Sequence, residues 1–217
     1  MKEVLDFLKE LKYNNNKEWM DTHREQYHSA KSKFEEFINL LIIEIQQFDE
    51  RILGLTPKNC IFRINRDIRF SKDKSPYKIN MGAFISEDGK KSYKPGYYIH
   101  IQPENESFMA GGIYAPPGDI LKKIRQEVDY NPVDLKEVVT QPDFKNFYGE
   151  IQGDKLKTAP QGYSADHPNI EFLKLKSYVV IHNFSDKEVR AQNFAEQVIT
   201  GFKILKPMND YLDIAIS

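Results

Sequence analysis

Four short segments between residues 60 and 114 alternate apolar and polar side chains, and only short, turn-rich stretches separate them. Alternation with a period of two is typical of a β-strand that has one buried face. Short connections between successive strands favour antiparallel neighbours, because a parallel pair needs a long crossover. The pattern therefore predicts an antiparallel meander, with strands expected over 60–70, 77–86, 96–102 and 107–114.

Helical periodicity flanks this run of strands on both sides. Residues 2–11 repeat apolar side chains at helical spacing, and a second helix is expected to begin after an N-cap at Asn16 and to run to about Phe48. The elements expected beyond the strands are a helix with Pro117 and Asp119 in its early turns, short helices near 132–139 and 168–175, a strand-like piece at 178–182, and a final helix from Ser185 to about Leu205. Pro207 is expected to end or kink that last helix.

Helices, then strands, then helices again predict an α+β fold rather than alternating βαβ units. No internal repeat or low-complexity linker divides the chain, so residues 1–217 are expected to form a single domain. Within it, 1–50 should be helical, 58–115 should form the sheet, and 116–217 should be mainly helical. We expect a roughly four-stranded antiparallel sheet with the N- and C-terminal helices packed on one face.

The composition is that of a soluble globular protein, with 40% hydrophobic and 29% charged residues. Cys60 is the only cysteine, which excludes an internal disulfide and a multi-cysteine metal cluster. The five histidines lack metal-ligand spacing, and no cofactor fingerprint or nucleophile elbow is present, so neither a metal nor a cofactor is indicated. The N-terminal segment lacks the apolar run of a signal peptide and no run is long enough for a membrane span, so the cytoplasm is the expected compartment.

Basic residues are concentrated in the middle of the chain. From Lys58 to Lys94 the sequence has ten Lys/Arg and four acidic residues, whereas the rest has 21 Lys/Arg and 28 acidic residues. The net charge of −1 hides this asymmetry. A basic segment within an acidic body can concentrate an anionic ligand locally without giving the whole protein affinity for nucleic acid.

The predicted strand over 60–70 divides its charged residues between two faces. Arg66 falls on the apolar face, where an unpaired guanidinium is costly, so it should have a carboxylate or carbonyl partner or lie at a break in the strand. The opposite face groups Arg63, Asn65, Asp67 and Arg69, and Asp67 can pair with either neighbouring arginine.

The same parity applied to the next two strands adds Lys78, Tyr98 and His100 to this polar face, and the basic turn adds Lys72 and Lys74. Such a set combines anion-binding cations with amide, phenol and imidazole groups. The predicted ligand-binding residues are Arg63, Asn65, Asp67, Arg69, Lys72, Lys74, Lys78, Tyr98 and His100. The favoured hypothesis is a site for a phosphorylated or carboxylated ligand. Whether any reaction is catalysed stays open; His100 and Asp67 are the candidate bases beside these cations.

Two alternatives remain at this stage. The basic face could instead dock an acidic protein or nucleic acid without catalysis, which a convex surface with many exposed lysines would favour. It could also be a purely structural network of arginine and aspartate that braces the sheet. No feature indicates a membrane partner, and the sequence leaves the oligomeric state open.

Five stretches of the chain together resemble a known family: "FLKELKYNNNKEWMDTHREQY", "RINRDIRFSKDKSPYK", "GGIYAP", "KLKTAPQGYSADHP" and "LKLKSY". The family is a widespread conserved-hypothetical one of bacteria and fungi, a domain of unknown function. The resemblance covers essentially the whole chain and implies a single-domain α+β protein, but it implies no activity, substrate or cofactor. The residues that match its motif are Trp19, Arg63, Arg66, Asp67, Arg69, Phe70, Ser71, Lys72, Asp73, Lys74, Pro76, Tyr77 and Lys78.

Two further groups of residues have an ordinary structural explanation. Trp19, His23 and Tyr27 follow helical spacing, and the favoured interpretation is a helix that docks its aromatic face on the sheet. In "APQGYSADHPNIEFLKLKSY", Gly162 is expected in a tight turn and Asp166 as a helix N-cap. Capping alone accounts for the second group, although a helix N-terminus can also bind an anion.

Overall fold

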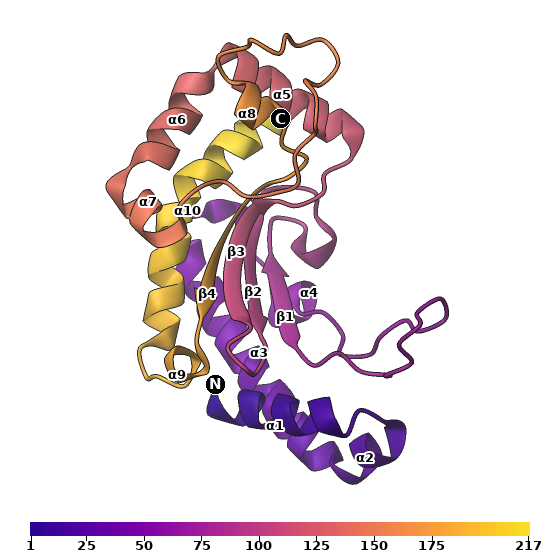
Figure 1. Ribbon diagram of the computed structural model, residues 1–217. Coiled ribbons are helices and arrows are strands. Elements are labelled where there is room, and N and C mark those ends of the chain that lie inside the picture. Colours follow the sequence, from indigo (N-terminus) through magenta and orange to yellow (C-terminus); the bar gives the residue numbers. More distant parts are fainter.

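The computed structural model describes residues 1–217 and contains one antiparallel sheet, ten α-helices and two short 3-10 helices (Figure 1). The strands lie side by side in chain order, which confirms the predicted α+β class and the four-stranded antiparallel sheet. The strands are β1 (Met81–Ile85), β2 (Gly96–Ile101), β3 (Ser107–Ile113) and β4 (Tyr178–Phe184).

The helices precede, interrupt and follow this sheet. Those before β1 are α1 (Lys2–Tyr13), α2 (Lys17–Thr22), α3 (Arg24–Gln46), η1 (Glu50–Ile52) and α4 (Pro57–Cys60), and η2 (Gly89–Lys91) lies between β1 and β2. Those after β3 are α5 (Gly118–Tyr130), α6 (Pro132–Thr140), α7 (Pro142–Tyr148), α8 (Ile170–Leu173), α9 (Asp186–Val189) and α10 (Phe194–Ile216). No helix is both long and apolar enough to cross a bilayer.

The two faces of the sheet differ in what covers them. The long helices α3 and α10 lie on one side of the strands (Figure 1). The side chains that point to this covered face are buried, as Tyr97, Ile99 and Ile101 of β2 show. The intervening residues Tyr98 and His100 point to the opposite face and are only partly buried. The parity predicted for this strand is therefore correct.

Glycine permits the close approach of α10 to the sheet. A Cβ atom at Gly111 would lie 2.1 Å from the Leu205 side chain and 2.6 Å from the backbone oxygen of Gly96. The next residue, Gly112, has a φ of +102°, a conformation that side-chain-bearing residues rarely adopt. The two glycines thus permit a close approach that brings Leu205 directly against β3.

The segment predicted as the first strand is not a strand. Thr56 and Asn59 form a capping box, and the short helix α4 occupies Pro57–Cys60. Residues 61–80 then leave the body of the protein as a projecting arm that returns at β1 (Figure 1). An isolated bridge joins Ile61 at the start of the arm to Ala83 of β1, and a second one, between Asn65 and Tyr77, links the two sides of the arm itself. The expected fourth strand is instead supplied by β4.

Several helix boundaries also differ from the sequence prediction. The second helix begins after the predicted N-cap, since Asn16 accepts a hydrogen bond from the Trp19 amide, but it breaks at His23 into α2 and α3. Ser185 caps only the short α9, and the chain turns again before α10 begins. Asp166 is not an N-cap, because α8 starts later, after Asn169. The helix α7 was not predicted.

Pro207 does not end the last helix, which continues to Ile216. Proline inside a helix removes one backbone hydrogen bond and costs about 3 kcal/mol. Around it, α10 buries Leu205, Met208 and Leu212 completely. Full burial of side chains of this size stabilises by about 1.5–3 kcal/mol each, so tertiary packing outweighs the local cost.

The contact between Gly111 and Leu205 can be tested by mutation. We expect Gly111→Ala to lower the free energy of unfolding by about 1–3 kcal/mol, because the new methyl group overlaps both a side chain and backbone. Gly118→Ala is the matched control, since a Cβ there meets nothing within 4 Å. Urea unfolding of both variants measures the difference. Equal midpoints would show that α10 does not need this close approach.

Candidate functional site

The arm, residues 61–80, is an irregular hairpin held together by a few backbone hydrogen bonds. The Lys78 amide donates to the Ile64 carbonyl at 2.8 Å, and the Arg66 amide donates to the Pro76 carbonyl at 2.9 Å. At its base, Asn15 donates to the Tyr77 carbonyl at 2.9 Å and accepts from the Tyr77 amide at 3.1 Å. The loop between α1 and α2 thus fixes where the arm leaves the protein.

Arg66 braces the far part of the arm. Its guanidinium pairs with Asp73 and donates to the Ser75 carbonyl at 3.0 Å, so it has the carboxylate and carbonyl partners that the sequence predicts. Asp73 also accepts from the Ser75 amide at 2.9 Å. The amide and hydroxyl of Ser75, together with Arg66, lower the pKa of Asp73 to about 2. Arg66 is half-buried rather than fully buried, because the arm has no core of its own.

Asp67 and Arg69 neutralise each other on the exposed arm. The guanidinium of Arg69 donates to both carboxylate oxygens of Asp67, at 2.9 and 2.6 Å. These hydrogen bonds lower the pKa of Asp67, which makes it a poor general base. Lys74 donates to the Ile68 carbonyl at 3.0 Å, whereas Lys72 is exposed and has no partner. Arg69, Lys72 and Lys74 therefore lie on the arm and not on the sheet.

The open face of the sheet, opposite α3 and α10, carries a group of aromatic rings. His100 stacks on Phe108 of the neighbouring strand, with ring centroids 4.6 Å apart and planes 16° from parallel. Tyr98 packs beside both rings, and Phe62 from the base of the arm meets Tyr98 edge-on at 6.4 Å. Gly82 makes room for this arrangement, since a Cβ there would lie 2.8 Å from the Tyr98 hydroxyl.

His100 lies at the centre of a polar chain on this open face. Its Nδ1 is 3.0 Å from the Tyr98 hydroxyl, and its Nε2 is 3.0 Å from Oε1 of Gln102. Gln102 in turn donates to Glu106. Burial lowers the pKa of His100, although the hydrogen bond with Gln102 opposes the shift, so the imidazole is neutral at neutral pH.

Two cations near these rings have no carboxylate partner. The Lys78 ammonium lies 5.6 Å from the centroid of the Phe62 ring and forms no ion pair or side-chain hydrogen bond. Burial and the nearby charge of Arg63 lower the pKa of Lys78. Arg63 is exposed and likewise forms no ion pair. Arg66 and Arg69 are paired with carboxylates, and Lys72 and Lys74 lie farther out on the arm. Arg63 and Lys78 are therefore the cations beside the open face that are left for an external anion.

The predicted site residues therefore separate into two groups. Lys78, Tyr98 and His100 come together on the open face, with Arg63 nearby. Strand parity accounts for Tyr98 and His100 of β2, whereas Lys78 and Arg63 lie outside the strands. Asn65, Asp67, Arg69, Lys72 and Lys74 are carried away on the arm. The sequence analysis missed Phe62, which the strand interpretation placed in the core, and Phe108, whose parity in the strand over 107–114 could have revealed it.

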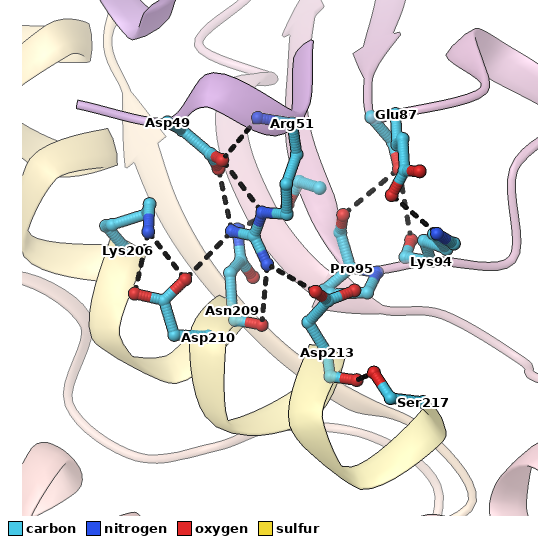
Figure 2. Close-up of polar contacts among 12 residues, drawn as sticks. Asp49, Arg51, Glu87, Lys94, Pro95, Lys206, Asn209, Asp210, Asp213 and Ser217 are labelled. Carbon is cyan, nitrogen blue, oxygen red and sulfur yellow. Dashed lines mark hydrogen bonds and ion pairs between the residues drawn. The ribbon is translucent and has the colours of Figure 1, made fainter. Parts of the chain in front are cut away.

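A second polar cluster joins η1 to α10 and has a structural explanation (Figure 2). Arg51 binds both oxygens of Asp49, at 2.8 and 2.7 Å, and also reaches Asp210 at 3.0 Å and Asp213 at 3.3 Å. Asp49 is 3% exposed and accepts a further hydrogen bond from the Tyr97 hydroxyl at 2.7 Å. Despite the cost of burial, these donors lower the pKa of Asp49. The cluster borders a cavity of about 500 Å³.

The remaining candidate groups serve packing. Trp19 stacks on His23 at 4.1 Å and packs beside Phe7 of α1, with ring centroids 6.0 Å apart, rather than on the sheet, which corrects the expected docking surface. His167 pairs with Asp129 of α5 at 2.9 Å and positions the chain before α8. Burial raises the pKa of the Cys60 thiol to about 11, so the thiol is unreactive at neutral pH. No group of three or more potential ligand side chains could hold a metal ion.

Fold and site together define an α+β protein with one covered and one open sheet face, and with a basic arm beside the open face. Residues 3–211 match the family described as "Conserved hypothetical protein (DUF2461)". Because this match spans nearly the whole chain, the protein belongs to that family. No curated protein and no solved structure matches the chain.

The buried cluster around Arg51 makes a test of stability possible. Arg51→Met leaves Asp49 buried without its main partner, so we expect the free energy of unfolding to fall by about 3–5 kcal/mol at pH 7. Arg24→Met is the control, because Arg24 pairs with Asp21 in an exposed position where such pairs contribute about 0–1 kcal/mol.

The same variant has a predicted pH dependence. In the parent protein the pKa of Asp49 is below its ordinary value, so its stabilising effect is present at neutral pH and is lost as the pH falls through the folded-state pKa. Without Arg51, burial should raise that pKa, and protonation then relieves the unpaired charge. The difference in stability between parent and variant should therefore shrink from pH 7 to about pH 4. A constant difference would contradict this account.

Proposed function

We propose that the open face of the sheet, at the base of the arm, binds a phosphorylated or carboxylated ligand through Lys78 and Arg63. The observation that carries this proposal is the half-buried Lys78 ammonium, which lies beside a second cation and has no counter-ion. A buried charge without a partner is costly, and proteins retain such groups chiefly where a ligand supplies the missing charge.

The neighbouring side chains suit such a ligand. Tyr98 and His100 lie on the same face, where the Tyr98 hydroxyl can hydrogen-bond an anion and His100 adds a positive charge when it is protonated. Phe62 and Phe108 present their rings to a less polar part of the ligand. Both nitrogens of His100 already have partners in the protein, and Asp67 is paired on the exposed arm. Neither is poised as a general base, so we propose binding and no chemical step.

The alternative of a structural brace does not apply equally to all the arginines. Arg66 and Arg69 have carboxylate partners within the arm and fit that role, whereas Arg63 and Lys78 hold nothing together. The two hypotheses therefore concern different residues. This separation makes a mutational test decisive.

Lys78→Met is the first test. We expect the variant to bind sulfate or pyrophosphate at least about tenfold more weakly, since a charge-assisted hydrogen bond contributes about 1.5–3 kcal/mol. Without ligand it should be as stable as the parent protein or more stable, because an unpaired, half-buried charge has been removed. Thermal denaturation with and without each anion measures both effects. Arg63→Met should show the same loss of binding.

Lys122→Met is the control for these variants, because Lys122 is an exposed lysine on α5 without a partner. It should leave anion binding unchanged. If neither sulfate nor pyrophosphate stabilises the parent protein, or if Lys78→Met unfolds more easily than the parent, the proposed binding role is wrong and Lys78 is structural.

The second test uses pH. Lys78, Tyr98 and the Gln102–Glu106 pair surround His100, whose pKa is below its ordinary value of 6.5 when no ligand is bound. A bound anion should raise that pKa, so binding takes up a proton and becomes tighter as the pH falls from about 7.5 to about 5.5. Sulfate is the suitable probe, since its own charge does not change over this range.

His100→Asn should abolish this pH dependence, while His28→Asn, a change at an exposed histidine of α3, should preserve it. Isothermal titration calorimetry in two buffers of different ionisation enthalpy measures the proton uptake directly. An affinity for sulfate that is independent of pH in the parent protein would exclude His100 from the site.

A further inference from the structure

The tip of the arm exposes an aromatic ring among cations. Phe70 is 96% exposed, the highest value among the large apolar side chains of the protein, and the Arg69 guanidinium lies 5.9 Å from its ring centroid. Lys72 and Lys74 follow in the same turn. Exposure of a whole phenylalanine ring is unfavourable in water, so this ring is available for contact with a binding partner.

Aromatic rings therefore occur at both ends of the arm. Phe70 lies at the tip, and Phe62 lies at the base, in contact with Tyr98 and next to the stacked pair His100–Phe108. Phe62 and Phe70 are eight positions apart in the sequence, a separation that can span at most roughly 26–29 Å. The arm also carries the cations without a carboxylate partner, namely Arg63, Lys72, Lys74 and Lys78.

A ligand that matches this surface must carry both planar rings and repeated negative charges. It must also be long enough to reach from the base of the arm to its tip, which is longer than a single small molecule. We propose that the ligand is a single-stranded nucleic acid, whose bases stack on Phe70 and on the rings of the open face while its phosphates contact the cations between them. This inference rests on the proposed function and names the class of ligand. Alternating aromatic and basic contacts are typical of proteins that bind single strands.

The form of the surface favours single strands over a duplex. In a double helix the base faces are already stacked, so an exposed ring such as Phe70 gains little from contact with it. The acidic remainder of the protein repels a polyanion, which restricts contact to the arm and the adjoining sheet face. A ring-free acidic polymer would use the cations but would leave the aromatic side chains without a role.

Fluorescence anisotropy with the full chain tests this inference. The probes are labelled oligothymidylate and oligouridylate of about 12 nucleotides, a duplex of the same length, and polyglutamate as a ring-free polyanion. We expect a single strand of DNA or RNA to bind more tightly than the duplex and polyglutamate. The logarithm of affinity should fall with the logarithm of salt concentration with a slope of about −3, as four phosphate contacts predict.

Phe70→Ala is the decisive variant, because a ring with 96% exposure can be removed without disturbing the fold. It should weaken binding of the single strand about 5- to 150-fold, the loss of one stacked base, while its thermal stability and its sulfate affinity stay unchanged. Tyr130→Ala is the matched control, since Tyr130 is 75% exposed at the end of α5 and should not affect binding.

The outcomes separate this inference from the proposed function. Sulfate binding without binding of either oligonucleotide at low salt would overturn the inference and leave the anion site intact. Equal affinity for single strands and polyglutamate, or no effect of Phe70→Ala, would also overturn it, because the cations alone would then account for binding. If neither sulfate nor the oligonucleotides bind, both proposals are wrong.

Discussion

The packing of α3 and α10 on the same face of the sheet is the constraint on which the rest of the structure depends. Leu205 of α10 reaches β3 only because Gly111 lacks a side chain, and the Arg51 cluster holds the C-terminal half of α10 to η1. The largest apolar side chains of the sheet, Tyr97 among them, are thereby buried on this side. The opposite face receives no comparable helix, and it is there that partly exposed rings and an unpaired lysine remain.

The sequence predicts the sheet well where each strand has one buried and one open face. In β2 the sequence correctly predicts that Tyr97, Ile99 and Ile101 are buried and that Tyr98 and His100 point to the open face. The prediction succeeds because burial of one face of a strand affects every second residue. Charge and residue type then indicate Lys78 and His100 as candidate site residues. Parity also places Phe108 on the face of His100, its partner in the neighbouring strand. A period of two, however, contains no information on which neighbouring element covers a face.

The region over 60–80 shows why the same reasoning fails elsewhere. The alternation of Phe62, Ile64 and Arg66 matches a strand, but Pro57 after Thr56 starts a helical turn instead, and both Asp67 and Asp73 bond back to the local backbone. Local hydrogen bonds of this kind compete with a sheet ladder. Whether a given arginine is paired also depends on the resulting turn. Parity distinguished Arg66 from Arg63, but it could not show that Asp67 pairs with Arg69 and leaves Arg63 without a carboxylate.

The arm and the open face also differ in rigidity, which bears on how a ligand would bind. Tyr98 and His100 are fixed by cross-strand packing and by hydrogen bonds, and Asn15 anchors the base of the arm through Tyr77. Beyond that point the chain is ordered by the Arg66 brace and a few local hydrogen bonds, such as that of Lys74 with the Ile68 carbonyl. A ligand held at the base would meet preorganised groups and lose little entropy there, whereas contacts at Phe70 would have to order the tip. Affinity should therefore originate at Lys78, and discrimination between ligands of different length should originate at the tip.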